Sequence, residues 1–529
     1  MIAFAGLLER LTFTPGRSAR LALLRHYFAT VPDPDRGIGL AVLTGERSFA
    51  VAKPALIRAL AAQRLDPQLV ALSFDFVGDL AETVALMWPD GATAAPPALQ
   101  EVAERLHATP QSDLPDLIAT WLDRSPAGVR FALLKLITGS LRASVPARLA
   151  KVALAEMSVG TVSADAVEEV WHALTPPYTE LFAWIEARGP RPDPKDAPVF
   201  RPLMLAHPLD HDPATLDPAS LRAEWQWDGL RVQLVATPGG RRIYSRDAEN
   251  ISAGFPEIIA AMDFDAVLDG ELLVVRDGAV APFADLQHRR NRTSATARMQ
   301  RDHPVQVRLY DILFDGPEDL RPLPFDTRRA RLESWFTAAP RLRMDLSALI
   351  PFTTMHDLAA RRATARAAAI EGLMLKRGDS PYLAGREYGL WWKWKRDPLS
   401  LDAVLMYAER GHGLRGSFYA DCTFGVWRDD GVLVPVGKAD SGLGDADLLF
   451  LDQWVRDHTS RRYGPVREVA PDLVLEIAFD AAQPSSRHKS GVALRFPRIA
   501  RIRHDKPAAE ADRLDTILAL AGITPDRDA

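Results

Sequence analysis

The sequence predicts a multidomain protein: an all-α N-terminal domain, then an α+β domain, then a small C-terminal β-barrel. The chain has 529 residues, which at roughly 150 residues per domain is enough for three or four domains. Apolar residues make up 47% and charged residues 25% of the chain, values that are typical of folded globular proteins and exclude a long disordered chain. The spacing of apolar residues also changes twice along the chain, and these changes mark the expected domain boundaries.

Residues 1–195 are expected to form a helical domain. Phe4, Leu7, Leu8 and Leu11 fall on one face of a 3.6-residue period, and similar spacing continues to about residue 187. Phe131, Leu134 and Ile137 lead into Gly139, a typical helix stop, and Lys135 and Arg142 are expected to project positive charge nearby. The proline-rich segment 188–195 cannot continue a helix and is expected to be a semi-rigid linker.

Residues 196–398 are expected to form the α+β domain. Short β-branched runs predict strands, and one helical pattern lies among them; the segments are Val232–Val235, Val267–Val275, Val305–Leu309 and, for the helix, Thr327–Phe336. After the tryptophan-rich segment 391–395, short strands separated by glycine-rich turns predict a β-barrel over 399–529; they are Asp402–Tyr407, Ser417–Trp427 and Leu473–Phe479. An oligonucleotide-binding (OB) fold is the leading candidate for this barrel.

Composition excludes several classes of protein. The formal net charge of −5 means that any nucleic-acid surface must come from local clusters of basic residues. Cys422 is the only cysteine, which excludes an internal disulfide and a thiolate metal cage and suits a reducing cytosol. Glu9 and Arg10 interrupt the first apolar stretch, and no run of about 18 apolar residues could span a membrane. We therefore expect a cytoplasmic protein without a membrane partner.

Three acidic residues stand in strand-like contexts of the middle domain. Each one taken singly is typical of a solvated or structurally paired acid, because buried acids need cations or hydrogen-bond donors. Only ten of the 64 basic residues are lysines, so each lysine is informative. The acids Glu224, Glu271 and Glu371, together with Lys376, Lys393 and Lys395, suggest a site for a metal-bound polyphosphate.

The order of the motifs sharpens this interpretation. The segments are Glu224-Trp-Gln-Trp-Asp-Gly-Leu-Arg231, Ser245-Arg-Asp247 with Phe255-Pro-Glu257, Leu268-Asp-Gly-Glu271, Leu309-Tyr-Asp-Ile312, Glu371-Gly-Leu-Met-Leu-Lys376, Trp392-Lys-Trp-Lys395 and Leu494-Arg-Phe-Pro-Arg-Ile499 with Arg503, Asp505 and Lys506. Any one of them alone is a weak signal. Together, in this order over about 280 residues, they resemble the ATP-dependent DNA ligases. The resemblance is strongest to bacterial members with all three domains, which are associated with DNA repair rather than chromosomal replication.

The resemblance implies a reaction and a set of partners. In such ligases a lysine attacks the α-phosphate of ATP, the adenylate moves to the 5′-phosphate at a nick, and the 3′-hydroxyl displaces AMP. The cofactors implied are ATP and Mg²⁺, and the substrate is nicked double-stranded DNA bound partly by the helical domain. The resemblance also implies a monomer in the cytoplasm, associated with the nucleoid, with a DNA-repair nuclease or helicase as a possible partner.

The resemblance also implies roles for single residues. Glu224 would face the adenine amine, Arg231 and Arg246 the ribose and phosphates, and Tyr310 would stack on the base. Glu271 and Glu371 would serve the ribose and the metal ion, Lys376 would bind the cofactor, and Lys393 and Lys395 would hold the α-phosphate. The C-terminal cluster Arg495, Arg501, Arg503 and Lys506 would orient the pyrophosphate. The DNA contacts expected are Lys135, Arg142, Arg289, Arg290, Arg292 and Lys489, with solvated loops as the alternative for the last four.

Gln226 is the one departure from the first motif, because it occupies the position of the nucleophilic lysine. An amide nitrogen is not a nucleophile toward phosphorus at neutral pH, and no lysine lies between Lys195 and Lys376. Self-adenylation should therefore fail, while Arg231, Lys393 and Lys395 remain as the other expected catalytic residues. Either a deliberate Lys→Gln substitution or a natural variant that binds DNA ends without sealing them explains the glutamine, and the intact remaining motifs favour the first.

Two other functions remain open at the level of the sequence. A non-catalytic protein that binds nicks or ends is compatible with Gln226. An RNA ligase or an RNA-capping guanylyltransferase shares the core motifs, but the large helical N-terminal domain argues against both.

Overall fold

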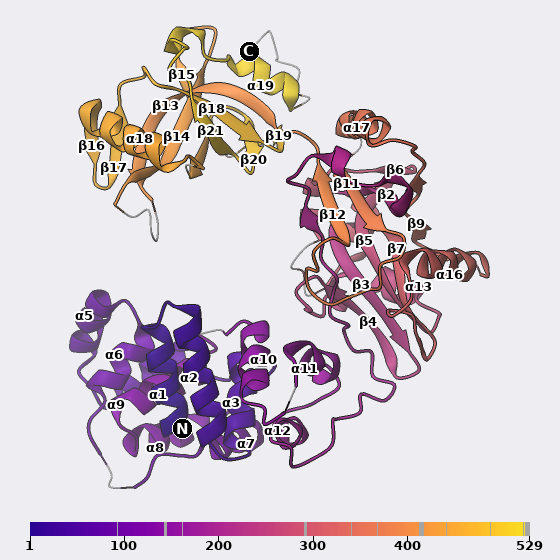
Figure 1. The fold of residues 1–529 in the computed structure, drawn as a ribbon. Coiled ribbons are helices and arrows are strands. Elements are labelled where there is room, and N and C mark those ends of the chain that lie inside the picture. The colour runs from indigo at the N-terminus through magenta and orange to yellow at the C-terminus, as the bar shows by residue number, and fades with distance from the viewer. Residues whose placement is uncertain are drawn as a thin grey trace. The chain divides into compact units, whose positions relative to one another are not determined.

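The computed structural model describes residues 1–91, 94–141, 145–160, 162–289, 292, 294–339, 341–367, 369–411, 417–440, 442–486, 488–521 and 523. The chain divides into two compact units, Met1–Lys395 and Arg396–Ala529. Each unit has its own hydrophobic clusters, and each is described by itself below (Figure 1).

The first part of unit one is helical, as the apolar spacing predicts (Figure 1). Its helices are α1 (Ile2–Thr12), α2 (Arg17–Thr30), α3 (Asp35–Leu43), α4 (Pro54–Ala62), α5 (Pro67–Val77), α6 (Leu80–Met87), α7 (Leu99–Ala108), α8 (Leu114–Asp123), α9 (Ala127–Ile137), α10 (Ala147–Glu156), α11 (Ala164–Trp171) and α12 (Thr179–Ile185). Local chemistry fixes several of their ends: the Asp66 and Asp79 carboxylates accept backbone N–H groups at the starts of α5 and α6. Gly139 follows α9 with φ of +66°, a conformation that favours glycine.

The second part of unit one contains two antiparallel-rich sheets. The first has the strand order β1-β12-β11-β2-β10, with β1 (His207–Pro208), β2 (Leu221–Trp227), β10 (Leu349–Ile350), β11 (Ile370–Arg377) and β12 (Trp391–Lys395). The second has the order β4-β3-β5-β7-β8, with β6 and β9 at its margin; its strands are β3 (Leu230–Thr237), β4 (Gly240–Ser245), β5 (Ala266–Arg276), β6 (Ala279–Val280), β7 (Val305–Asp315), β8 (Glu318–Asp319) and β9 (Met344–Leu346).

The two sheets share buried side chains, which fixes them against each other. One cluster joins Val235, Val267 and Leu313 of the second sheet to Trp391 of the first. The helices of this part are α13 (Pro256–Ala261), α14 (Phe283–Gln287), α15 (Ala297–Asp302), α16 (Phe325–Thr337) and α17 (Met355–Ala363). Trp391, Trp392 and Trp394 are at most 8% exposed, so this run packs in the core and is not a surface platform for bases.

Unit two contains one antiparallel sheet, whose strands differ in length, and a separate two-stranded sheet. Its strands are β13 (Leu399–Arg410), β14 (Tyr419–Trp427), β15 (Leu433–Asp440), β16 (Thr459–Tyr463), β17 (Val466–Val469), β18 (Val474–Phe479), β19 (Ala481–Pro484), β20 (Val492–Arg495) and β21 (Arg498–Ile502), with helices α18 (Asp445–Asp457) and α19 (Leu514–Leu520). The long strand β13 pairs with β14, β17 and β18, so it organises the unit. In the part of the chain that the structure describes, no helix is long and apolar enough to cross a membrane.

Candidate active site

Strands β2, β11 and β12 bring the predicted residues of the first sheet onto one face. Gly372 of β11 is paired with Gln226 on one side and with Lys395 on the other. Two residues further along β11, Met374 is paired with Glu224 and Lys393 in the same way. Directly paired residues in an antiparallel sheet project to the same side, so the acid, the glutamine and both lysines share a face.

The second sheet contributes Arg231, Glu271 and Tyr310. Arg231 of β3 is paired with Glu271 of β5, and the guanidinium carbon of Arg231 lies 5.9 Å from the centre of the Tyr310 ring. Arg231 donates to both oxygens of Asp269, over 3.1 and 2.6 Å. This bidentate pair holds the guanidinium in one orientation, because a fork of two parallel hydrogen bonds restricts rotation.

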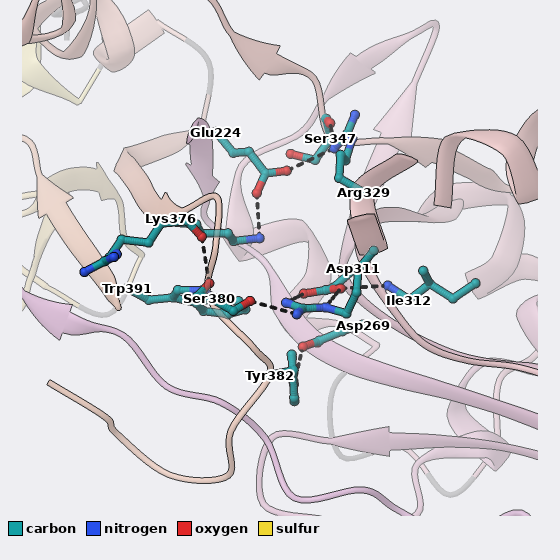
Figure 2. Close-up of polar contacts among 12 residues, drawn as sticks. Glu224, Asp269, Asp311, Ile312, Arg329, Ser347, Lys376, Ser380, Tyr382 and Trp391 are labelled. Carbon is teal, nitrogen blue, oxygen red and sulfur yellow. Dashed lines mark hydrogen bonds and ion pairs between the residues drawn. The ribbon is translucent and has the colours of Figure 1, made fainter. Parts of the chain in front are cut away.

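Tyr382 completes this arrangement from the loop after β11. Its hydroxyl donates to Asp269 over 2.7 Å and accepts from Arg231 over 3.2 Å. Asp269 is fully buried and Tyr382 is 4% exposed, so water cannot replace these bonds. Figure 2 shows Tyr382 beside the Asp269 carboxylate, with the hydrogen bond between them as a dashed line.

The side chain of Gln226 lies next to Glu371. Its side-chain nitrogen donates to Glu371 Oε2 over 2.7 Å, and Lys395 Nζ lies 3.7 Å from the same oxygen. Gln226 is only 9% exposed, and its side-chain oxygen is buried without a hydrogen-bond partner among the described residues. An unsatisfied buried acceptor is costly, so the amide fits this position less well than an ammonium group would.

The titratable groups of the site have shifted pKa values. Burial raises the pKa of Glu271 to about 8, since desolvation outweighs the attraction of Arg231 and Lys393. Burial, together with the charges of Arg231 and Arg246, lowers the pKa of Lys393. Burial raises the pKa of the Tyr310 hydroxyl well above its ordinary range. Clusters of perturbed groups of this kind are typical of reactive sites.

Glu224 and Lys376 form a buried ion pair at one end of the site (Figure 2). The Lys376 ammonium lies 2.6 Å from Glu224 Oε2, and Arg329 donates to Glu224 Oε1 over 3.3 Å. Both members of the ion pair are 2% exposed. Lys376 therefore faces an acid of its own sheet and not open solvent.

The carboxylate oxygens of the site suit a hard divalent cation that also binds water and phosphate. Among the residues that the structure describes, they do not form a site that encloses a metal ion with protein ligands alone. Within the described ranges, no group of three or more His, Cys, Asp or Glu side chains could hold a metal ion by itself. Glu371 raises the pKa of Glu271 electrostatically, so the two carboxylates are close enough to interact. Mg²⁺ typically takes one or two carboxylates and fills its remaining positions with water and phosphate oxygens.

The C-terminal basic residues all lie in unit two. Arg501 pairs with Glu476 over 2.6 Å. Arg503 and Lys506 both pair with Asp402 over 2.8 Å. Arg495 lies at the end of β20, and its guanidinium carbon is 5.2 Å from the Phe496 ring.

Two of the residues expected to contact DNA are buried in the structure. Lys135 is 7% exposed and pairs with Asp79 inside the helical part. Arg289 is fully buried and pairs with Glu257, with further bonds to the Gly254 and His303 carbonyls. Both charges are satisfied internally, so neither can reach a DNA phosphate without breaking a buried pair.

The other expected DNA contacts have different outcomes. Lys489 is exposed on the segment before β20, so it stays a candidate. Arg292 is also exposed. Arg142 and Arg290 lie outside the described residues.

Sequence reasoning did not single out Asp269, Tyr382 or Arg329 as site residues. Asp269 stands inside the Leu-Asp-Gly-Glu segment, which was a usable signal. Tyr382 and Arg329 have no local signature, because their partners lie 113 and 105 residues away in the chain. Contacts of that kind come from the tertiary fold alone.

Comparison with known proteins identifies a family for the chain. Residues 203–395 match the family model described as "ATP dependent DNA ligase domain", and residues 415–506 match the "ATP dependent DNA ligase C terminal region". A probable DNA ligase of Koribacter versatilis is 34% identical over 75% of this chain and 73% of its own length. A probable DNA ligase of Opitutus terrae is 31% identical over 98% of this chain, which spans 62% of that relative.

A solved structure shares the fold along most of the chain. The protein named "Pmar-Lig_PreS3" superposes with a TM-score of 0.53 at 15% identity, over 94% of this chain and 99% of its own. The helical N-terminal region, the α+β region and the OB-like C-terminal region thus have folds found in that protein. The two family models and the Koribacter relative show that the chain belongs to the ATP-dependent DNA ligase family, enzymes that use ATP to form phosphodiester bonds in DNA.

Proposed function

We propose that the chain acts on nicked double-stranded DNA as a ligase whose first chemical step is blocked at residue 226. The observation that carries the proposal is the position of Gln226, which shares a sheet face with Glu224, Lys393 and Lys395 and donates its side-chain N–H to Glu371. The amine nucleophile that adenylate formation needs is replaced there by an amide. Self-adenylation requires that amine, so this chain should not form the enzyme adenylate.

Different residues around Gln226 would bind different parts of the nucleotide. Arg231, held by Asp269 and Tyr382, is oriented to bind the ribose or the phosphates. Arg246 is exposed but close enough to lower the pKa of Lys393, so these cations can hold the α-phosphate with Lys395. The half-buried Tyr310 ring offers a face on which the base can stack.

Glu271 and Glu371 are the residues that would hold Mg²⁺ together with the phosphates. When bound, the ion would neutralise negative charge that builds on the phosphate oxygens. Burial makes the Glu271 carboxyl hold its proton more tightly, since it raises the pKa to about 8, and a nearby cation would favour the ionised form. Glu371 already meets Lys395 and the amide of Gln226, so it also links the metal side of the site to the nucleophile position.

The last step does not need the missing amine. If AMP is already attached to the 5′-phosphate of a nick, the 3′-hydroxyl attacks that phosphorus and AMP leaves. The chain's residues only have to position the two DNA ends and stabilise the phosphate charge. We therefore propose that this chain closes nicks that arrive pre-adenylated.

The remaining parts of the chain would serve DNA binding and closure. We propose a helical DNA-binding domain over 1–195, an adenylation domain over 196–398 and an OB-fold over 399–529. In this scheme Arg495 and Arg501 bind phosphate oxygens, which an arginine fork suits. A monomer that works near the nucleoid with a repair nuclease or helicase completes the proposal.

A second candidate function is a protein that binds nicks or DNA ends without sealing them. Gln226 supports it, because a glutamine that cannot be adenylated still leaves the Glu371 and Lys395 charges in place beside it. Tight binding to nicked DNA with no closure of a pre-adenylated nick would favour this candidate.

Nick sealing by a Gln226→Lys variant, with ATP and Mg²⁺ on a nicked duplex, tests the proposal. Sealing by the variant and none by the unmodified chain is the expected result. Absence of sealing by a folded variant that binds ATP would move the assignment to a nick-binding protein or to another nucleic-acid substrate.

A further inference from the structure

The Lys376 ammonium lies in a cage of three aromatic rings. Its Nζ is 4.8 Å from the centre of the Tyr310 ring and 4.7 Å from the centres of the Phe325 and Trp391 rings. Trp391 is fixed in turn by a 3.0 Å hydrogen bond from its indole nitrogen to the Ser380 hydroxyl (Figure 2). Because the rings surround the ammonium, it cannot turn toward another acid or toward a phosphate.

Glu224 is the acid that pairs with this ammonium in the described part of the chain. The 2.6 Å contact is buried, with both residues 2% exposed. A buried ammonium needs an acid beside it, and Glu224 supplies that acid. Arg329 holds the other carboxylate oxygen and is itself anchored by a 2.7 Å bond to the Ser347 carbonyl. The carboxylate is thus held in one direction by a contact at each oxygen.

A carboxylate fixed in this way can only accept hydrogen bonds. Of the two common purine nucleotides, ATP presents an amino group at position 6 of its base, and GTP presents a carbonyl oxygen there. An acceptor held in one direction attracts the amino group and repels the carbonyl. A carboxylate that is free to turn away from the base would lose this preference.

We propose that Lys376 is a positioning residue that sets the preference for ATP over GTP by holding Glu224 as a fixed acceptor. The inference rests on the proposed function, since that function stacks the base on the Tyr310 ring, which lies beside Lys376 and its partner Glu224. It assigns Lys376 to the base through Glu224, and it removes this lysine from the residues that contact the polyphosphate.

The chain provides a matched control for this lysine. Lys151 forms a buried ion pair with Glu168 in the helical part, and its Nζ lies 4.6 Å from the centre of the Trp171 ring. Lys151 is 1% and Glu168 4% exposed. A Lys→Met substitution at either position removes the same kind of buried ion pair and aromatic contact, but only Lys376 touches the proposed site.

The test measures the equilibrium affinities of Mg·ATP and Mg·GTP by calorimetry in the full chain. Gln226 makes this practicable, because binding can be followed without adenylation. We expect the unmodified chain to prefer ATP, and Lys376→Met to reduce the ratio of the two affinities about tenfold. Lys151→Met should lower the melting temperature about as much as Lys376→Met does. It should leave the ratio of the ATP and GTP affinities unchanged.

The outcomes separate the inference from the proposed function. An unmodified chain that binds no ATP overturns the proposed function itself. A chain that prefers ATP, with the same preference in Lys376→Met, shows that the lysine only stabilises the fold and overturns the inference. If Lys376→Met does not fold, Glu224→Gln decides: an amide that can both donate and accept should cut the preference by a similar factor, and an unchanged ratio refutes the scheme.

Discussion

A nick that already carries AMP on its 5′-phosphate should be closed by the unmodified chain. The perturbation to compare is Gln226→Lys, which restores the amine next to Glu371. In the last step the side chain at 226 contributes only a contact to the Glu371 carboxylate, now made by the amide over 2.7 Å. Replacing a neutral donor by a charged one changes such a contact by about 1.5 kcal/mol, or close to tenfold in rate.

The first step should respond on a different scale. There the amine forms the bond to phosphorus, and loss of a nucleophile costs on the order of a million-fold in rate, or about 8 kcal/mol. On an ordinary nick with ATP and Mg²⁺, the two proteins should therefore differ by several orders of magnitude. On the pre-adenylated nick they should differ by about tenfold. The contrast between the two substrates is the prediction, because it cancels differences in expression, folding and DNA affinity.

The assay follows closure of a 5′-labelled nicked duplex on a denaturing gel, with each substrate and each protein. Gln226→Arg is the control, since it restores a positive charge beside Glu371 but supplies no nucleophilic amine. It should close only the pre-adenylated nick. The reasoning is refuted if that nick stays open with the unmodified chain under conditions where Gln226→Lys closes it.

Three further predictions concern single side chains. Tyr382→Phe removes a bond to a buried carboxylate and should lower the free energy of unfolding by about 1.5–3 kcal/mol and weaken ATP binding severalfold, as urea denaturation and calorimetry would show. Because the pKa of Glu271 is raised from 4.5 to about 8, the folded protein keeps a proton that the unfolded chain releases. The free energy of unfolding should thus fall as the pH rises from the lower to the higher of those two values. Glu271→Gln should flatten that part of the curve of stability against pH. Arg289→Ala should cost about 3–5 kcal/mol of stability by leaving Glu257 unpaired, whereas Lys489→Ala should preserve stability and reduce the salt dependence of DNA binding by about one phosphate contact.

The helical and strand-forming segments of the chain could be predicted because they depend on local patterns. Helical spacing in residues 1–187 corresponds to helices that end at Ile185, and each β-branched run chosen in the middle domain lies within a strand. The acids Glu224, Glu271 and Glu371 all lie in strands, as their apolar neighbours suggested. Side-chain alternation along a strand is a property of a few consecutive residues, so the sequence carries it directly.

Whether a single charged residue is buried or exposed could not be predicted in the same way. Arg289 begins a basic run that is typical of a solvated or DNA-binding loop, yet it is fully buried against Glu257, 32 residues earlier in the chain. Lys135 was expected to project charge, yet it pairs with Asp79, 56 residues earlier. Whether a cation is buried depends on an acid that the fold brings to it, and one sequence does not reveal that pairing.

The few lysines of the chain bear on how Gln226 should be understood. Ten of the 64 basic residues are lysines, and three of them, Lys376, Lys393 and Lys395, lie on the two adjacent strands β11 and β12. An ammonium fits among three aromatic rings and can lose its proton when buried, whereas a guanidinium is larger and stays charged. In a chain that otherwise favours arginine, lysines at these three points indicate that the pocket still requires the compact cation. We therefore expect glutamine at 226 to block one chemical step at a site whose other charged groups remain assembled.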